Sequence, residues 1–147
     1  MQLDRVMVAV KDGKFDEEAV GVACDLVRPS KGTVYALHVI EVSRGDPVDV
    51  DNSVATRTGE EVLQQVEHLV RSRRCQVQAE LLQARDVGPA VVQEAIDKEV
   101  DLIILGLPYK QRYGDFNEGN AVPYVLRHAP CRVVVWREPM SAFGGSR

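Results

Sequence analysis

Residues 88–106 read GPAVVQEAIDKEVDLIILG, and the spacing of the apolar residues changes partway through this stretch. In the first part Val92 and Ile96 lie four positions apart, as on one face of a helix. Pro89 takes the first helical position, where its missing N–H costs no hydrogen bond. Residues 102–105 are then continuously apolar, which is typical of a strand buried on both faces. The stretch therefore predicts a helix that leads into a strand of a parallel sheet.

Four further strands are predicted along the rest of the chain. Residues 6–10, 34–40 and 133–136 are almost continuously apolar, as expected for buried strands of a parallel sheet. Residues 75–83 instead alternate between apolar and polar side chains, which indicates a half-exposed edge strand. The sheet is therefore expected to have five strands, with at least one of them at an edge.

Helical spacing fills the segments between these strands. It covers residues 15–26, 62–70 and 122–129, and in the last segment Val125 and Leu126 are expected on the buried face. The resulting order, strand and helix in strict alternation, predicts a doubly wound α/β fold. Such a fold is a three-layer sandwich, with helices on both faces of a parallel sheet.

The composition bounds the function. Apolar residues make up 45% and charged residues 27% of the chain, as in ordinary globular domains, and the net charge of −4 excludes a broad basic surface for nucleic acid. The N-terminal apolar run is too short for a signal peptide or a membrane span, so we expect no membrane insertion and a cytoplasmic location. One domain is expected at residues 1–138, followed by a flexible tail at 139–147.

The cysteines and histidines match no catalytic or metal-binding motif. Cys24, Cys75 and Cys131 are odd in number and have no CxxC or Cys/His spacing, so they predict neither a disulfide framework nor a zinc site. We expect them to be buried thiols. His38 lies inside the second strand and is predicted to be a structural residue, and no histidine has the neighbours of a catalytic triad. No catalytic residue and no metal site are expected.

A ligand would bind where the winding of the sheet reverses, outside the carboxyl ends of the first and fourth strands. The loops there are residues 11–14, KDGK, and residues 106–120, GLPYKQRYGDFNEGN. Glycines let a backbone approach phosphates, and free N–H groups at the start of the fourth helix would donate to them. A single long connection, residues 41–60, is rich in Gly, Pro, Asp and Ser and is predicted to be a loop of the kind that often covers a site.

Four segments resemble the universal stress protein family: VMVAVKDG, VYALHV, GPAVVQEAIDKEVDLIILG and VPYVLRHAPCRVVV. They occur in the family's order and spacing over residues 3–137. The resemblance implies the strand order 3-2-1-4-5 and a homodimer joined through the last strand, Arg132 to Trp136. Some members of the family bind ATP or a related adenine nucleotide, and others bind no nucleotide. For this chain the resemblance implies ATP or a related adenine nucleotide as ligand, with or without Mg²⁺.

The chain departs from the nucleotide-binding motif of that family. Counted from Gly106, Tyr109 takes the place of the second glycine and Asn120 that of the hydroxyl residue, whereas Gly119 is kept. Lys11 stands where the family usually has aspartate, and Asp12 follows one position later. The side chain of Tyr109 restricts close approach of the backbone, but charges at Lys11, Lys110 and Arg112 could replace the lost backbone donors.

Two functions from different classes follow from these residues. The first is a non-catalytic stress-response or regulatory protein that binds an adenine nucleotide such as ATP or AMP and acts as a homodimer. The alternative is a nucleotide-free interaction module, with a signalling partner or a membrane transporter that it regulates or is attached to. An enzyme is not favoured, because no Walker P-loop or GxGxxG motif follows the first strand. The residues expected to line the nucleotide crevice are Val10, Lys11, Asp12, Val39, Gly106, Lys110, Arg112, Gly119 and Asn120.

Overall fold

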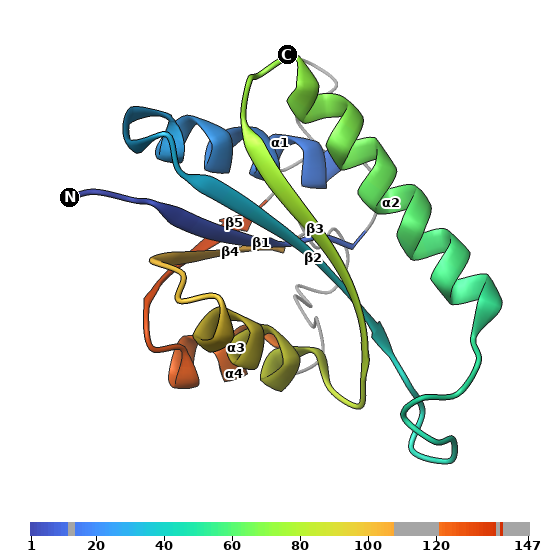
Figure 1. Ribbon diagram of the computed structural model, residues 1–147. Coiled ribbons are helices and arrows are strands. Elements are labelled where there is room, and N and C mark those ends of the chain that lie inside the picture. Colours follow the sequence, from blue (N-terminus) through green and yellow to red (C-terminus); the bar gives the residue numbers. More distant parts are fainter. Residues whose placement is uncertain (12–13, 108–120, 138, 140–147) are drawn as a thin grey trace.

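The computed structural model describes residues 1–11, 14–107, 121–137 and 139, without the side chains of residues 14 and 15. Its five strands form one parallel sheet in the order β3-β2-β1-β4-β5, which confirms the predicted fold (Figure 1). Two segments with predicted roles lie outside the described residues: the loop at 108–120 and most of the C-terminal tail. The strands are β1 (Arg5–Ala9), β2 (Thr33–Glu41), β3 (Gln76–Ala84), β4 (Leu102–Leu107) and β5 (Arg132–Arg137).

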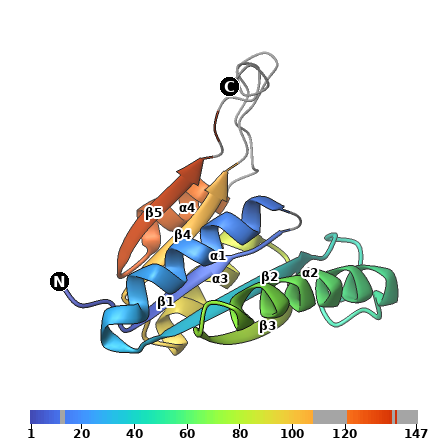
Figure 2. The ribbon, with the colours of Figure 1, turned by 90° about the horizontal axis from the view of Figure 1, so that it is seen from above.

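Helices cover both faces of the sheet. Figures 1 and 2 show α1 and α2 on one face and α3 and α4 on the other. Successive side chains of β1 point to opposite faces of the sheet. Val6 and Val8 pack with α1 and α2, while Met7 packs with α3 and α4. All three are fully buried, which explains the continuous apolar run. The helices are α1 (Lys14–Val27), the short 3₁₀ helix η1 (Arg28–Ser30), α2 (Ser53–Arg71), α3 (Val87–Asp97) and α4 (Ala121–His128).

Three details of the predicted helices are wrong. Helix α3 begins at Val87, so Pro89 is its third residue and not its first. Its buried face consists of Gly88, Val91, Val92 and Ala95, and Ile96, one position beyond that face, is 47% exposed. In α4 the buried residue is Val125, while the next residue, Leu126, is 57% exposed. Each of these helices buries a single narrow face, because its other side meets solvent.

Helix α2 is longer than the sequence indicated. It begins at Ser53, so the second part of the predicted loop at 41–60 is helical. The side chain of Asn52 caps the helix by accepting a hydrogen bond from the Ala55 backbone N–H at 3.3 Å. The first turn carries no buried apolar residue to show helical spacing, since Val54 is 75% exposed, and the capping asparagine was the available signal.

A carboxylate pair lies between β3 and α3. Glu80 Oε1 and Glu94 Oε2 are both buried, and neither has a hydrogen-bond partner in the described part of the chain. Lys98 Nζ approaches Glu80 Oε2 at 3.5 Å. Burial raises the pKa of Glu94, and the neighbouring carboxylate of Glu80 raises this pKa further. Glu94 therefore holds its proton above the pH at which an unfolded glutamate loses it.

This raised pKa predicts a pH-dependent contribution to stability. Because the folded state binds the Glu94 proton more tightly, wild-type stability should fall as pH rises from the unfolded pKa through the raised folded one. Glu94→Gln, which cannot ionise, should therefore become more stable relative to wild type across that window. Urea unfolding at several pH values measures this difference. Glu67→Gln, on the exposed side of α2, serves as control, and a pH-independent difference for Glu94→Gln would contradict the prediction.

Candidate functional site

The register of the sheet brings part of the predicted crevice together. Ala9 of β1 pairs with Leu37 of β2 on one side and with Leu105 of β4 on the other. Since the strands are parallel, the residues that follow these three lie at the same edge, where the winding reverses between β1 and β4. The predicted site residues at this edge are Val10, Lys11, Val39 and Gly106.

The other five predicted site residues lie outside the described part of the chain. They are Asp12, Lys110, Arg112, Gly119 and Asn120. Tyr109, the residue that departs most from the family motif, lies in the same undescribed loop. The assignment of all nine residues to a nucleotide site therefore stays a prediction.

The backbone groups and the side chain of Val10 make contacts within the protein. Its backbone N–H donates to Leu37 O at 2.8 Å, and its carbonyl accepts from His38 Nδ1 at 2.9 Å. A carbonyl can only accept, so this nitrogen of His38 carries a proton. The side chain of Val10 is buried in the core under α1 and α2. Val10 thus fixes where the loop after β1 begins, and His38 is a hydrogen-bonded structural residue.

Asp16 organises the loop after β1, a role that the sequence analysis missed. Its carboxylate accepts the Lys11 backbone N–H at 3.0 Å, and the residue is only 6% exposed. It stands in the first turn of α1, where the helix dipole favours a negative charge. The residue itself was visible in the sequence as one of the acidic residues that suit a helix start, but nothing there showed its bond to Lys11.

The side chains at this edge point to two sides of the sheet. Val10 packs in the core under α1 and α2, whereas Val39 is half-buried and packs against the core under α3 and α4. Lys11 has an exposed side chain. A ligand at this edge would therefore meet Val39 from the side of α3 and α4, and it would meet Val10 only through its backbone.

The long connection after β2 is tied to the end of β3. Gln83 Nε2 donates to Val48 O at 2.9 Å and to Val50 O at 3.1 Å, and Arg85 donates to Ser43 O. The segment between β2 and α2 therefore lies beside β3, at the same edge as the crevice (Figure 1). Its role as a cover of the site stays a prediction.

Within residues 1–11, 14–107, 121–137 and 139, no three His, Cys, Asp or Glu side chains gather where they could hold a metal ion. None of the helices in these ranges is long and apolar enough to cross a membrane.

Comparison with known proteins gives a consistent result. The sequence profile described as the universal stress protein family matches residues 2–137. A universal stress protein of Methanocaldococcus jannaschii is 23% identical over 141 residues, which cover 92% of this chain and 82% of the relative.

Solved structures show the same fold at low sequence identity. The universal stress protein from Archaeoglobus fulgidus in complex with dAMP is 19% identical, with a TM-score of 0.71 over 92% of this chain and 98% of that one. A universal stress protein family protein from Arabidopsis thaliana with AMP bound is 16% identical, with a TM-score of 0.65 over 94% of each chain. Together with the match over nearly the whole sequence, these likenesses show that the chain belongs to the universal stress protein family.

Proposed function

We propose that this protein binds an adenine nucleotide at the ends of β1 and β4 and uses it as a signal, without chemical turnover. The observation that carries the proposal is the register, which places Lys11, Val39 and Gly106 at one edge of the sheet. The AMP and dAMP complexes of the structurally similar proteins support the choice of ligand. A nucleotide acts as a signal when it binds one state of the protein more tightly than another.

The residues at this edge suit such a ligand. Val39 is half-buried and offers an apolar surface to a base, and the exposed side chain of Lys11 can approach a phosphate. Helix α4 begins at Ala121, and its N-terminal end favours negative charge. Pro123 lies in the first turn of α4 and removes one N–H donor there, so we expect cationic side chains of the preceding loop to contribute more.

Calorimetric titration of nucleotide-stripped protein with AMP and with Mg-ATP tests this proposal. We expect a dissociation constant at or below about 100 micromolar, or about −5.5 kcal/mol. Lys110→Ala combined with Arg112→Ala should weaken binding by about tenfold, because charge-assisted contacts to phosphate are lost. Arg57→Ala combined with Arg71→Ala removes two exposed charges from α2 and should leave affinity unchanged.

Three outcomes would contradict parts of the proposal. Equal affinity of the wild type and the Lys110/Arg112 variant would contradict the role of the loop cations. Release of several molecules of inorganic phosphate from Mg-ATP per protein molecule would contradict the absence of turnover. No detectable heat with either nucleotide would favour the alternative, a nucleotide-free interaction module that acts on a signalling partner or a transporter, which the donor loss at Pro123 supports.

We also propose that the protein is a homodimer joined through β5. This strand lies at one edge of the sheet, so one side of its backbone has no neighbouring strand in the described part of the chain. Val134 is 37% exposed on β5, and Leu126 is 57% exposed on the adjoining α4. Trp136 Nε1 donates to Glu18 Oε1 at 2.6 Å, which ties the carboxyl end of β5 to α1. An edge of this kind fits a second copy of the same strand.

A further inference from the structure

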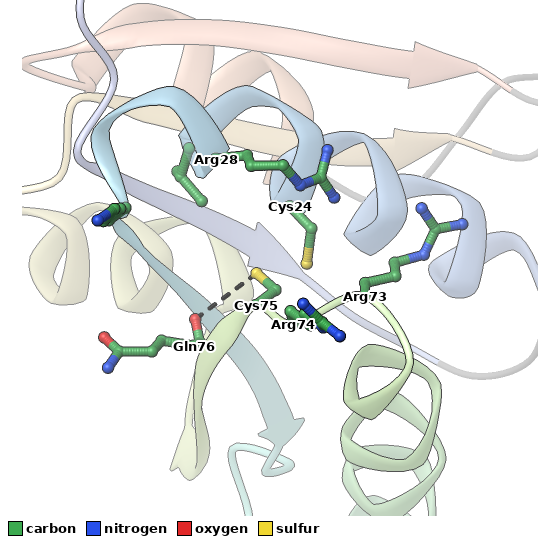
Figure 3. Close-up of a pocket in the computed structure, with 9 residues that line it drawn as sticks. Cys24, Arg28, Arg73, Arg74, Cys75 and Gln76 are labelled. Atoms are coloured by element: carbon green, nitrogen blue, oxygen red, sulfur yellow. Dashed lines mark hydrogen bonds between the residues drawn. The ribbon is translucent and has the colours of Figure 1, made fainter.

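A pocket lies at the amino ends of the strands, where β2 and β3 begin. Its volume is about 390 Å³, within the range of small-molecule sites, and it lies between the end of α1 and the turn after α2 (Figure 3). Because the nucleotide crevice is at the carboxyl ends of the strands, the two sites are separate. Two thiols and four cations line the pocket: Cys24, Cys75, Arg28, Lys31, Arg73 and Arg74.

The two cysteines meet in this pocket although 51 positions separate them. Cys24 lies on α1 and is 1% exposed, and Cys75 is half-buried directly before β3. Figure 3 shows both thiols in the space between α1 and the start of β3, where the Cys75 thiol donates to the Gln76 carbonyl at 3.8 Å. The expectation of buried thiols is confirmed for Cys24 and is wrong for Cys75 and Cys131, which are half-buried. Sequence spacing gave no signal, because the pairing depends on α1 packing beside the start of β3.

The two thiols differ in the direction of their pKa shifts. The neighbouring thiol of Cys24 lowers the pKa of Cys75, burial and the charge of Asp25 oppose this, and the charges of Arg28 and Arg73 lower the pKa further. The neighbouring Cys75, together with burial, raises the pKa of Cys24. The proton that leaves first is therefore that of Cys75, the more accessible thiol, and thiolates rather than thiols attack disulfides.

The cations give the pocket a preference for anions. Asp25 Oδ1 accepts from Arg28 Nη1 at 2.8 Å and lies 3.8 Å from Arg73 Nη1, so one carboxylate serves two guanidinium groups. Lys31 and Arg74 make no ion pair with any described residue. The guanidinium of Arg73 packs on α1 at Gly21, where a Cβ would lie 3.1 Å from its Cζ. The pocket therefore keeps a net positive charge beside the thiols.

We propose that Cys24 and Cys75 form a reversible disulfide by exchange with an anionic, carboxylate-bearing small disulfide that binds to these cations. The Cys75 thiolate attacks one sulfur of that disulfide, whose S–S bond breaks, and the first small thiolate leaves and takes a proton. Cys24 then loses its proton to water and attacks the Cys75 sulfur, which releases the second small thiolate. Two electrons pass from the cysteines to the small disulfide, which is released as two thiols.

Oxidised glutathione, which carries several carboxylates, is the probe for the test, and cystamine, a cationic disulfide, is its control. Reduced protein should lose two hydrogens by intact mass spectrometry, and its peptides should show a Cys24–Cys75 link. Reaction with oxidised glutathione should be at least about tenfold faster than with cystamine, because like charges repel the cationic probe. Lys31→Glu combined with Arg74→Glu should remove or reverse this preference.

Single substitutions separate the roles of the two thiols. Cys24→Ser should stop at a stable glutathione adduct on Cys75, since no second thiol is present to displace it. Cys75→Ser should remain unmodified at Cys24, which is buried, and Cys131→Ser should react as the wild type does. Modification at Cys131 alone, or equal rates with the two disulfides, would overturn the proposal. None of these outcomes depends on nucleotide binding.

Discussion

Gly32→Ala is expected to lower the free energy of unfolding by about 3 kcal/mol, the upper end of the usual cost of overpacking. Gly32 connects η1 to β2, and its backbone N–H donates to Val27 O at 3.0 Å. A Cβ at this position would lie 2.1 Å from the carbonyl oxygen of Asp4. That carbonyl accepts the Thr33 N–H at 2.8 Å, so it cannot move away without losing the bond that joins β2 to the chain before β1.

Chemical denaturation followed by circular dichroism measures the effect. Gly45→Ala is the matched control, because Gly45 lies in the connection after β2 and the nearest atom to a Cβ there is Ser43 Oγ, at 3.9 Å. That variant should lose little or no stability. If the two variants unfolded at the same denaturant concentration, the close approach of Asp4 at Gly32 would not carry the cost that we assign to it.

Val134→Asp is expected to convert the proposed dimer into a monomer. In a symmetric dimer through β5 the substitution enters the interface from both copies, so each new carboxylate is desolvated near its counterpart. Val134 is already 37% exposed in the single chain, and the fold of the monomer should tolerate the change. Light scattering during size-exclusion chromatography should give twice 16.3 kDa for the wild type and 16.3 kDa for the variant.

Val54→Asp controls for the added charge. Val54 is 75% exposed at the start of α2. This helix packs against β2 and β3, away from β5 at the other edge of the sheet, so the substitution should leave the dimer intact. A monomeric wild type would contradict the dimer proposal. A dimeric Val134→Asp variant would place the interface elsewhere.

The periodicity of apolar residues was sufficient to predict the fold class, whereas the strand order came from the family resemblance. Residues such as Val6, Met7 and Val8 must be apolar because each side of the sheet has its own helical layer, and such runs are easily seen in a sequence. The exposed positions were harder to predict, because Ile96 and Leu126 differ from their buried neighbours only by about 100° of rotation around a helix. Apolar side chains alone do not show where a narrow buried face ends.

The candidate crevice could be predicted in position but not in its internal contacts. The pattern of elements predicted the edge at which a ligand would bind, the family resemblance implied the strand order, and the observed register brings Lys11, Val39 and Gly106 to that edge. The bonds from Lys11 to Asp16 and from His38 to Val10 depend on side-chain orientation at the ends of the strands. The meeting of Cys24 and Cys75 depends on helix packing across the sheet and left no motif in the sequence.

The central place of β1 determines how the crevice can move. Its backbone is hydrogen-bonded to β2 on one side and to β4 on the other, and its three central side chains are buried under both helical layers. Amide protons of such a strand exchange with solvent only when nearly the whole domain opens. The loop after β1 is therefore anchored to the slowest-exchanging part of the protein. The end of β1 therefore stays fixed when a ligand binds, and any adjustment must occur elsewhere in the crevice.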